Sequence, residues 1–174
     1  MRERLIRIRL LLLDVDGVMT DGRIIYDDSG GETKAFDVKD GHGIKLIQRA
    51  GIRVGIITGR QSTVVQRRAE ELGIDLVYQG VKDKLAPLRE IQQKTGLSLE
   101  EIAYAGDDVI DLPVLRRVGF AATVADAVDD VKPHVHYVTQ AGGGRGAVRE
   151  LCDLLLKETG RWGEVTAKYF ADSH

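Results

Sequence analysis

The sequence predicts an α/β fold, a Rossmann-like three-layer sandwich around a mainly parallel central sheet. Short apolar runs bounded by turn residues alternate with segments of helical periodicity, an order typical of consecutive βαβ units. No fixed-period repeat or low-complexity segment interrupts this order. At 174 residues the chain is long enough for one well-filled core and too short for two ordinary domains. We therefore predict a single domain over residues 1–174.

Each predicted strand is a short apolar run. The expected strands cover residues 6–13, 53–57, 76–78, 102–105, 120–123 and 136–138. The first of them contains Leu10–Leu13, an uninterrupted run of leucines that belongs inside the core. Helices should fill most of the gaps, because parallel strands need crossover connections.

Capping residues mark where the helices start and stop. Asp40 precedes a glycine-flanked helix, and Ser62 opens a helix over residues 63–72. The segment from Ser98 to Glu101 fits a capping box. Glycines stand where helix C-caps belong, at Gly51, Gly73 and Gly96.

Two segments fall outside this alternation. Residues 23–36 form two extended stretches around an Asp-Ser-Gly-Gly turn, so we predict a β-hairpin projecting from the sheet after the first strand. Residues 158–174 form a C-terminal tail that contains aromatic side chains. The sequence assigns this tail no contacts.

Charge and cysteine content limit the classes of partner. The net charge is −2 and the pI is about 6.1, with both signs intermixed, so the chain has no overall attraction for nucleic acid. The N-terminal apolar run is too short for a signal peptide or a membrane span. Cys152 lies in the apolar stripe of a predicted helix, where we expect core packing. These features indicate a soluble, cytoplasmic protein with small-molecule or protein partners.

Two carboxylates end the first predicted strand. Asp14 and Asp16 are two positions apart, so in an extended chain their side chains lie on the same face and can approach one point. Gly17 permits the sharp turn of the backbone that follows. Buried carboxylates are costly unless they are paired or bound to metal. A calcium loop does not explain them, because Met19 and Ile25 stand where such a loop needs Gly and Glu. The pair therefore suits another divalent hard cation.

Polar residues follow each of the first four predicted strands. They are Asp14 with Asp16, Thr58 with Arg60, then Lys84, and finally Asp107 with Asp108. The carboxyl ends of parallel strands meet at one edge of the sheet, so these side chains should converge there. The carboxylates can bind a cation, and the hydroxyl and ammonium groups can bind the anionic oxygens of a phosphate. One carboxylate remains free to attack the phosphorus. The set therefore indicates phosphoryl transfer with Mg²⁺ offsetting the repulsion between carboxylate and phosphate.

These residues resemble, in order, the four motifs of the haloacid dehalogenase superfamily. The matching segments are residues 14–18, 56–60, 84 and 106–111. Within the superfamily, residues 36–44, 57–62, 79–84 and 143–150 are similar to the family of 3-deoxy-D-manno-octulosonate 8-phosphate phosphatases. The similarity extends over nearly the whole chain up to Leu156.

The resemblance implies a role for each catalytic residue. Asp14 would be the nucleophile that forms an aspartyl-phosphate. Asp16 would protonate the leaving alkoxide and then activate water. Thr58 and Lys84 would bind the transferring phosphoryl group. The implied enzyme is a phosphatase, a hydrolase of phosphoric monoesters in lipopolysaccharide precursor biosynthesis.

The resemblance also implies a Mg²⁺ site. Asp14 and Asp107 would bind the ion through carboxylate oxygens, and Asp16 through its backbone carbonyl. Asp108 or Asp111 would hold the surrounding shell in orientation.

A sugar-acid phosphate is the substrate implied by the resemblance. Its contacts would come from Asp37, Val38, Lys39, Asp40, Gly41, Arg60 and Arg68, together with Asp16 and Lys84. Guanidinium groups bind a carboxylate in bidentate fashion, which makes Arg60 the most specific indicator of substrate. A related branch acting on sialic-acid-like nine-carbon sugar phosphates is expected to carry an acidic residue at that position, so Arg60 favours the octulosonate.

The chain has no room for a cap domain, which many superfamily members use to cover the site. The hairpin alone lies at the usual insertion point. A neighbouring subunit would therefore cover the site, in a homotetramer as the family implies.

Other readings of the sequence remain open. A response-regulator receiver domain shares the acidic pocket, threonine and lysine, but its phospho-acceptor follows the third strand, where this chain has Val77-Tyr78-Gln79-Gly80. An inactive binding protein on the same fold is a further alternative, although every expected catalytic residue type is retained. His134 and His136 could share a strand face, yet ordinary packing is favoured over zinc because no further ligand is nearby. His42 has no assigned role.

Overall fold

A six-stranded sheet forms the centre of the computed structural model, which describes residues 1–171. Its strand order is β5-β4-β1-β6-β7-β8, and every neighbouring pair is parallel. The strands are β1 (Leu10–Leu13), β4 (Arg53–Ile57), β5 (Leu76–Tyr78), β6 (Ile102–Ala105), β7 (Phe120–Thr123) and β8 (Tyr137–Val138). The predicted parallel α/β sheet is therefore confirmed.

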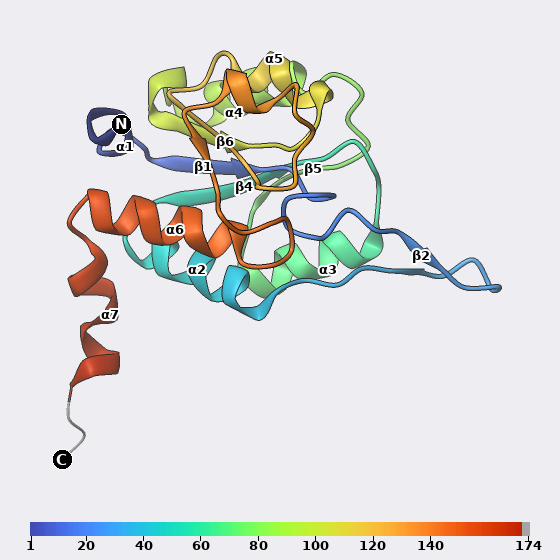
Figure 1. Cartoon of the computed structure of the whole chain (residues 1–174), viewed down its shortest axis with the longest axis horizontal. Coiled ribbons are helices and arrows are strands. Elements are labelled where there is room, and N and C mark those ends of the chain that lie inside the picture. Colours follow the sequence, from blue (N-terminus) through green and yellow to red (C-terminus); the bar gives the residue numbers. More distant parts are fainter. Residues whose placement is uncertain (172–174) are drawn as a thin grey trace.

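Helices cover both faces of this sheet (Figure 1). One layer contains α2 (Val38–Arg49), α3 (Thr63–Leu72) and α6 (Ala147–Glu158), and the other contains α4 (Leu85–Thr95) and α5 (Leu112–Leu115). Alternate side chains of β1 enter the two resulting cores. Leu11 and Leu13 pack with the first layer, whereas Leu10 and Leu12 pack with the second. This is the three-layer sandwich that the sequence predicts.

The N-terminal part of the first predicted strand is wrong. Residues Arg2–Leu5 form a short helix, α1, and the strand begins at Leu10. The helical turn buries Leu5 while Arg2 and Arg4 stay exposed, and it continues into the predicted strand because the backbone N–H groups of Ile6 and Arg7 donate to the carbonyls of Arg2 and Arg4. Regular strand pairing starts where the run of leucines starts.

The capping predictions hold with one shift. Asp37, not Asp40, caps α2, since its side chain accepts a hydrogen bond from the Lys39 backbone N–H. Ser62 precedes α3, and Gly73 and Gly96 adopt the left-handed conformation at the ends of α3 and α4. The capping box of Ser98 forms, but it opens only a 3₁₀ turn over Leu99–Glu101. Cys152 is buried on α6, as expected.

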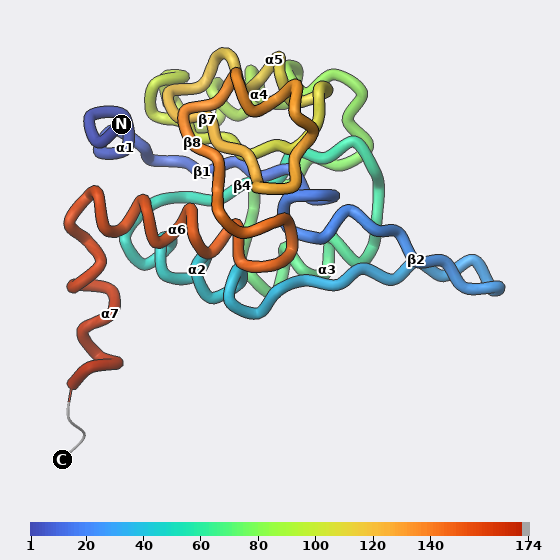
Figure 2. Tube along the Cα trace, viewed as in Figure 1, coloured from blue at the N-terminus to red at the C-terminus, as the bar shows by residue number. Residues whose placement is uncertain are grey.

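The predicted hairpin lies between β1 and α2. Its strands β2 (Ile25–Tyr26) and β3 (Glu32–Thr33) pair antiparallel and project beyond the sheet (Figures 1 and 2). Asp27 holds the connecting turn by accepting hydrogen bonds from the backbone of Ser29 and Gly31. In the described residues no further strand or helix is inserted at this point, so nothing resembling a cap domain is present there.

Much of the C-terminal tail forms a helix, α7 (Trp162–Phe170), which extends away from the sheet (Figure 2). Tyr169 fastens it to α2, because its hydroxyl accepts a hydrogen bond from Arg49 and its ring lies edge-on to His42. Residues 172–174 of the predicted tail lie outside the described residues. Across the described chain, every helix falls short of the length and apolar character needed to cross a membrane.

Candidate active site

The predicted polar residues converge at the carboxyl edge of the sheet. The chain runs from β1 to β4 and β5 on one side, and then crosses to β6, β7 and β8 on the other. The order reverses between β1 and β6, which is where open α/β sheets bind ligands. A pocket at this edge is lined by Asp14, Asp16, Gly22, Thr58, Gly59, Arg60, Asp107, Asp108 and Ile110.

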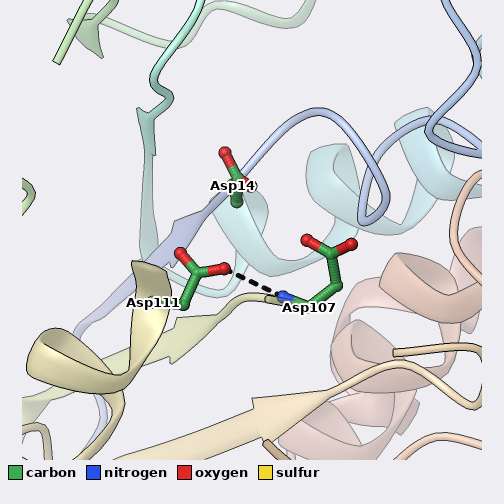
Figure 3. Close-up of side chains that lie close together, drawn as sticks. All are labelled: Asp14, Asp107 and Asp111. Carbon is green, nitrogen blue, oxygen red and sulfur yellow. Dashed lines mark hydrogen bonds between the residues drawn. The ribbon is translucent and has the colours of Figure 1, made fainter. Parts of the chain in front are cut away.

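Three carboxylates form a cluster at this pocket, of which Asp14 and Asp107 line it and Asp111 is fully buried beside them (Figure 3). Oxygens of Asp14, Asp107 and Asp111 all lie within 4.8 Å of one another. Both oxygens of Asp111 already accept hydrogen bonds from the protein. One accepts from the backbone N–H groups of Asp107 and Asp108, and the other accepts from the side chains of Lys84 and Tyr104. Asp14 and Asp107 are thus the carboxylates with capacity for a ligand.

The environment of Asp107 also fits a cation. Its Oδ1 atom is buried and has no hydrogen-bond partner among the described residues. Gly17, with φ of +91°, lies so close to the Asp107 carboxylate that a Cβ atom there would collide with it. A buried carboxylate oxygen without a protein partner is costly, and a bound hard cation would satisfy it.

Burial and mutual repulsion perturb both carboxyls. Burial raises the pKa of Asp14 to about 6, with Lys84 opposing the rise and Asp111 adding to it. Burial raises the pKa of Asp107 to about 7, and the charges of Asp14 and Asp111 contribute in the same direction. Such a pair of raised values in a cleft is a feature of functional sites.

Lys84 lies between the acids of the cluster. It stands at the start of α4, its side chain is 3% exposed, and its ammonium is 3.1 Å from Asp14 and 2.6 Å from Asp111. Burial opposes its charge, but Asp14 and Asp111 together outweigh burial, so the pKa of Lys84 is raised. Lys84 therefore stays cationic beside the predicted nucleophile.

Tyr104 is a site residue that the sequence did not reveal. It lies on β6 in a run that otherwise reads as core, and its side chain is fully buried. Its hydroxyl donates to Asp111 and accepts from Lys84 at 3.2 Å. Burial raises the pKa of Tyr104 well above its ordinary value, so the phenol stays protonated.

Thr58 occupies its predicted position. It follows β4, is 2% exposed, and lies next to Gly59 in the pocket lining. Its backbone N–H donates to the Tyr78 carbonyl, which continues the pairing of β4 with β5 and fixes the residue at the strand end.

The side chain of Asp16 points toward the hairpin. It pairs with Lys34, just after β3, and one oxygen lies 3.9 Å from Arg60 Nε. Arg60 also donates to Tyr26 at 2.7 Å and to Glu32 at 3.2 Å. The hairpin thus supplies the side chains that contact two pocket residues, Asp16 and Arg60. Nothing in the local sequence distinguishes Lys34 from a solvated lysine, so sequence analysis missed it.

The structure does not bring the remaining predicted substrate residues into this pocket. Arg68 lines a separate hollow with Phe36 and Val38. Asp40 is buried against the start of α6, where it accepts a hydrogen bond from the Arg149 backbone at 2.8 Å. Burial raises the pKa of Asp40 to about 6. Lys39, like Val38, is exposed on the first turn of α2, next to the buried Gly41.

A parallel α/β sheet with a cation-binding acid cluster and a buried lysine at its switch point defines an enzyme that handles an anionic ligand with a divalent metal. Comparison with known families agrees, since residues 32–119 match the model of the haloacid dehalogenase-like hydrolases. The chain belongs to this family of hydrolases.

Several proteins similar to the chain are named as phosphatases for one sugar acid. The chain is 48% identical over 158 residues to the 3-deoxy-D-manno-octulosonate 8-phosphate phosphatase KdsC of Escherichia coli, covering 91% of this chain and 84% of that protein. The crystal structure of the phosphatase of the same name from Yersinia pestis has a TM-score of 0.91 at 48% identity, covering 92% of this chain and 86% of that one. The Moraxella catarrhalis phosphatase, in complex with magnesium ion, phosphate ion and KDO, has a TM-score of 0.94 at 42% identity, covering 97% of each chain.

Proposed function

We propose that this chain is a Mg²⁺-dependent phosphatase that hydrolyses 3-deoxy-D-manno-octulosonate 8-phosphate to the free sugar acid and inorganic phosphate. The observation that carries the proposal is the meeting of Asp14, Lys84 and Asp107 at the switch point of the sheet. The names of its relatives supply the substrate. The reaction would serve lipopolysaccharide precursor biosynthesis.

The chain's own residues account for two successive displacements at phosphorus. A carboxylate oxygen of Asp14 attacks the phosphorus, the bond from phosphorus to the sugar oxygen breaks, and Asp16 gives its proton to that oxygen. Asp16 then takes a proton from water, whose oxygen attacks the phosphorus and breaks the bond to Asp14. Inorganic phosphate leaves, and both aspartates return to their starting states.

Asp14 and Asp107 would hold Mg²⁺ through their free carboxylate oxygens, together with the backbone carbonyl of Asp16. When bound, the ion supplies positive charge that offsets the repulsion between the carboxylate and the phosphate dianion. Asp111 fits a supporting role, because its oxygens hold the Asp107 backbone and Lys84 in place. Asp108 is exposed, and its side chain accepts from the Val109 backbone.

Lys84 and Thr58 would bind the transferring phosphoryl group, since Thr58 lines the pocket and the ammonium of Lys84 contacts Asp14. Arg60 would bind the carboxylate of the sugar acid. Its side chain is 42% exposed and lines the same pocket, so it is accessible to a ligand. A cation at this position supports the octulosonate over a nine-carbon sugar whose phosphatase would carry an acid there.

A homotetramer would complete the site. Arg68 and Val38 line a hollow apart from the Asp14 pocket, and Lys39 is exposed beside Val38, so these parts of the predicted substrate set would contact the substrate bound by a neighbouring subunit. Exposed apolar side chains on the hairpin and on α2, at Ile25, Tyr26 and Val38, would lie between subunits. The composition and the lone cysteine support a cytoplasmic location for this small-molecule enzyme, without nucleic-acid or membrane partners.

Phosphate release from a panel of esters tests this function. The panel contains 3-deoxy-D-manno-octulosonate 8-phosphate, a nine-carbon sugar-acid phosphate, and glucose 6-phosphate as a neutral sugar, each assayed with Mg²⁺ and with EDTA. We expect Mg²⁺-dependent release and the highest kcat/KM for the octulosonate. Similar kcat/KM values for all three esters would contradict the substrate assignment. Phosphate release that EDTA does not reduce would contradict the proposed Mg²⁺ dependence.

A further inference from the structure

A closed ring of alternating charges joins the hairpin to the pocket. Lys34 pairs with one oxygen of Asp16 and lies 3.6 Å from Glu32 Oε1. Arg60 reaches the other oxygen of each acid, at 3.2 Å from Glu32 Oε2 and 3.9 Å from Asp16 Oδ2. Each oxygen of Asp16 therefore faces a different cation.

The two cations of the ring differ in accessibility. The Lys34 side chain is 0% exposed, whereas that of Arg60 is 42% exposed. Arg60 lines the pocket and Lys34 does not. Lys34 therefore acts on a ligand only through Asp16, while Arg60 is free to exchange Glu32 for a ligand carboxylate.

Because the Lys34 side chain is enclosed by protein, its contact with Asp16 restricts where the Asp16 carboxyl can lie. An ammonium without solvent is stable only when anionic groups surround it, and Asp16 and Glu32 are its salt-bridge partners in the described chain. The backbone of Lys34 follows β3 directly, so the base of the hairpin fixes the position of its ammonium. The ammonium in turn fixes the direction of the Asp16 carboxyl.

We propose that Lys34 is a positioning residue that holds the Asp16 carboxyl in line with the ester oxygen of the substrate. This inference rests on the proposed phosphatase function, in which the Asp16 proton passes to that oxygen as its bond to phosphorus breaks. Lys34 gives and takes no proton in the step. A carboxyl free to rotate would meet the ester oxygen less often, and proton donation would become less efficient.

Leaving groups of different basicity report this role. A nitrophenolate is weakly basic and departs without a proton. Phenolate is more basic and depends more on proton donation, and a sugar alkoxide is the most basic and depends on it most. The parameter kcat/KM includes the steps up to leaving-group departure. We therefore measure kcat/KM for nitrophenyl phosphate, phenyl phosphate and the sugar-acid phosphate with wild type, Lys34→Gln and Lys34→Arg.

We expect Lys34→Gln to lower kcat/KM about 10- to 100-fold for the sugar phosphate, part of the usual contribution of general acid catalysis. The loss should be smaller for phenyl phosphate and less than about threefold for nitrophenyl phosphate. Lys34→Arg should restore most of the sugar phosphate rate, because it keeps the cation. Lys132→Gln, at an exposed ion pair, is the control and should leave all three rates unchanged.

Equal losses on all three esters, or no loss, would overturn the positioning role. If Lys34→Gln does not fold, Lys34→Met fills the same buried space and is measured in the same way. If both variants are unfolded, Lys34 is required for folding, and the proposed positioning role would also be overturned. The proposed function fails separately, if wild type releases no phosphate from any ester with Mg²⁺.

Discussion

Lys84 Nζ lies 3.1 Å from Asp14 Oδ1, although the two residues follow different strands of the sheet. Both side chains are nearly inaccessible to solvent, and Lys84 also contacts Asp111, which is fully buried. One cation therefore compensates two acids in the interior. Its removal would leave both acids without this cation at the point where chemistry is expected.

Lys84→Met should lower both stability and activity. Breaking a buried ion pair on one side costs about 3 kcal/mol or more, and loss of a group that stabilises the transition state costs about 10²- to 10³-fold in kcat. Urea unfolding at pH 8 and phosphate release measure the two effects. Lys94→Met removes an exposed partner of Glu90 and should change neither. Equal behaviour of the two variants would contradict the assigned role of Lys84.

Asp14→Asn should keep the fold and lose about 10⁴-fold or more in turnover, since an amide cannot form the acyl-phosphate. The fold should tolerate the change because a buried, charge-repelled carboxylate becomes neutral. Acid quenching during turnover of a radiolabelled ester should trap phosphate on wild type but not on this variant. Asp75→Asn, at an exposed position, should label like wild type. Undiminished turnover by Asp14→Asn would refute the nucleophile.

The metal-free protein should lose stability as the pH rises from about 5 to 8. Asp14 and Asp107 have folded-state pKa values of about 6 and about 7, raised from 3.8, so the folded state binds protons more tightly than the unfolded state. That stabilisation is complete below the unfolded-state pKa and is lost as the pH passes the folded-state values, on the order of a few kcal/mol in total. Urea unfolding in EDTA measures it.

Mg²⁺ should reverse the loss at pH 8, because it binds the ionised carboxylates and competes with protons at pH 5. Asp40 has a pKa of about 6 and contributes in the same direction. Asp40→Asn should therefore flatten part of the pH dependence in EDTA and leave the effect of Mg²⁺ intact. Stability that rises with pH in EDTA would contradict the strain in the acid cluster.

Arg60→Glu should raise KM for a carboxylated sugar phosphate about 100-fold or more, because it replaces a charge-assisted contact with repulsion. The KM for a neutral aryl phosphate should change much less. Steady-state kinetics on both esters gives the comparison. Arg89→Glu makes the same charge change at an exposed position on α4 and serves as the control. An equal increase in KM for both esters would contradict a role of Arg60 in recognising the sugar acid.

Two inactive chains should restore activity to one another. In an Asp14→Asn homo-oligomer every site lacks the nucleophile, and in an Arg68→Ala homo-oligomer every site would lack the arginine of the neighbour. Co-expression creates interfaces at which an intact Asp14 faces an intact Arg68. We expect phosphate release well above the sum of the separate variants, and a tetramer mass by light scattering. Activity no greater than that sum, in mixed oligomers of verified composition, would place Arg68 outside the neighbour's site.

Local patterns predicted the sheet and most of the pocket. Runs of apolar residues mark the strands, and the rule that parallel strand ends meet at one edge places Asp14, Thr58 and Asp107 together without a structure. The start of β1 was misjudged because residues 6–9 are also compatible with an extended chain, and only the backbone hydrogen bonds from Leu5 and Ile6 to Met1 and Arg2 show a helical turn before it.

The contacts around Asp16 and Asp111 were not predictable in the same way. Lys34 resembles any lysine of a polar hairpin, and Tyr104 resembles any aromatic residue of a core strand. Their roles depend on which atoms the folded backbone places within hydrogen-bond distance, and that information is not contained in periodicity or spacing. Sequence analysis found the groups at strand ends, and the family resemblance added Asp111, but Lys34 and Tyr104 were missed.

The strand order has a consequence for how the protein inactivates. Asp14 comes from the half of the sheet built from β1, β4 and β5, and Asp107 from the half built from β6, β7 and β8. Neither half holds both carboxylates, so a proteolytic fragment of either would lack one of the two carboxylate ligands proposed for the ion. Release of the ion on heating should therefore coincide with separation of the two halves, and metal retention would report the integrity of the whole molecule.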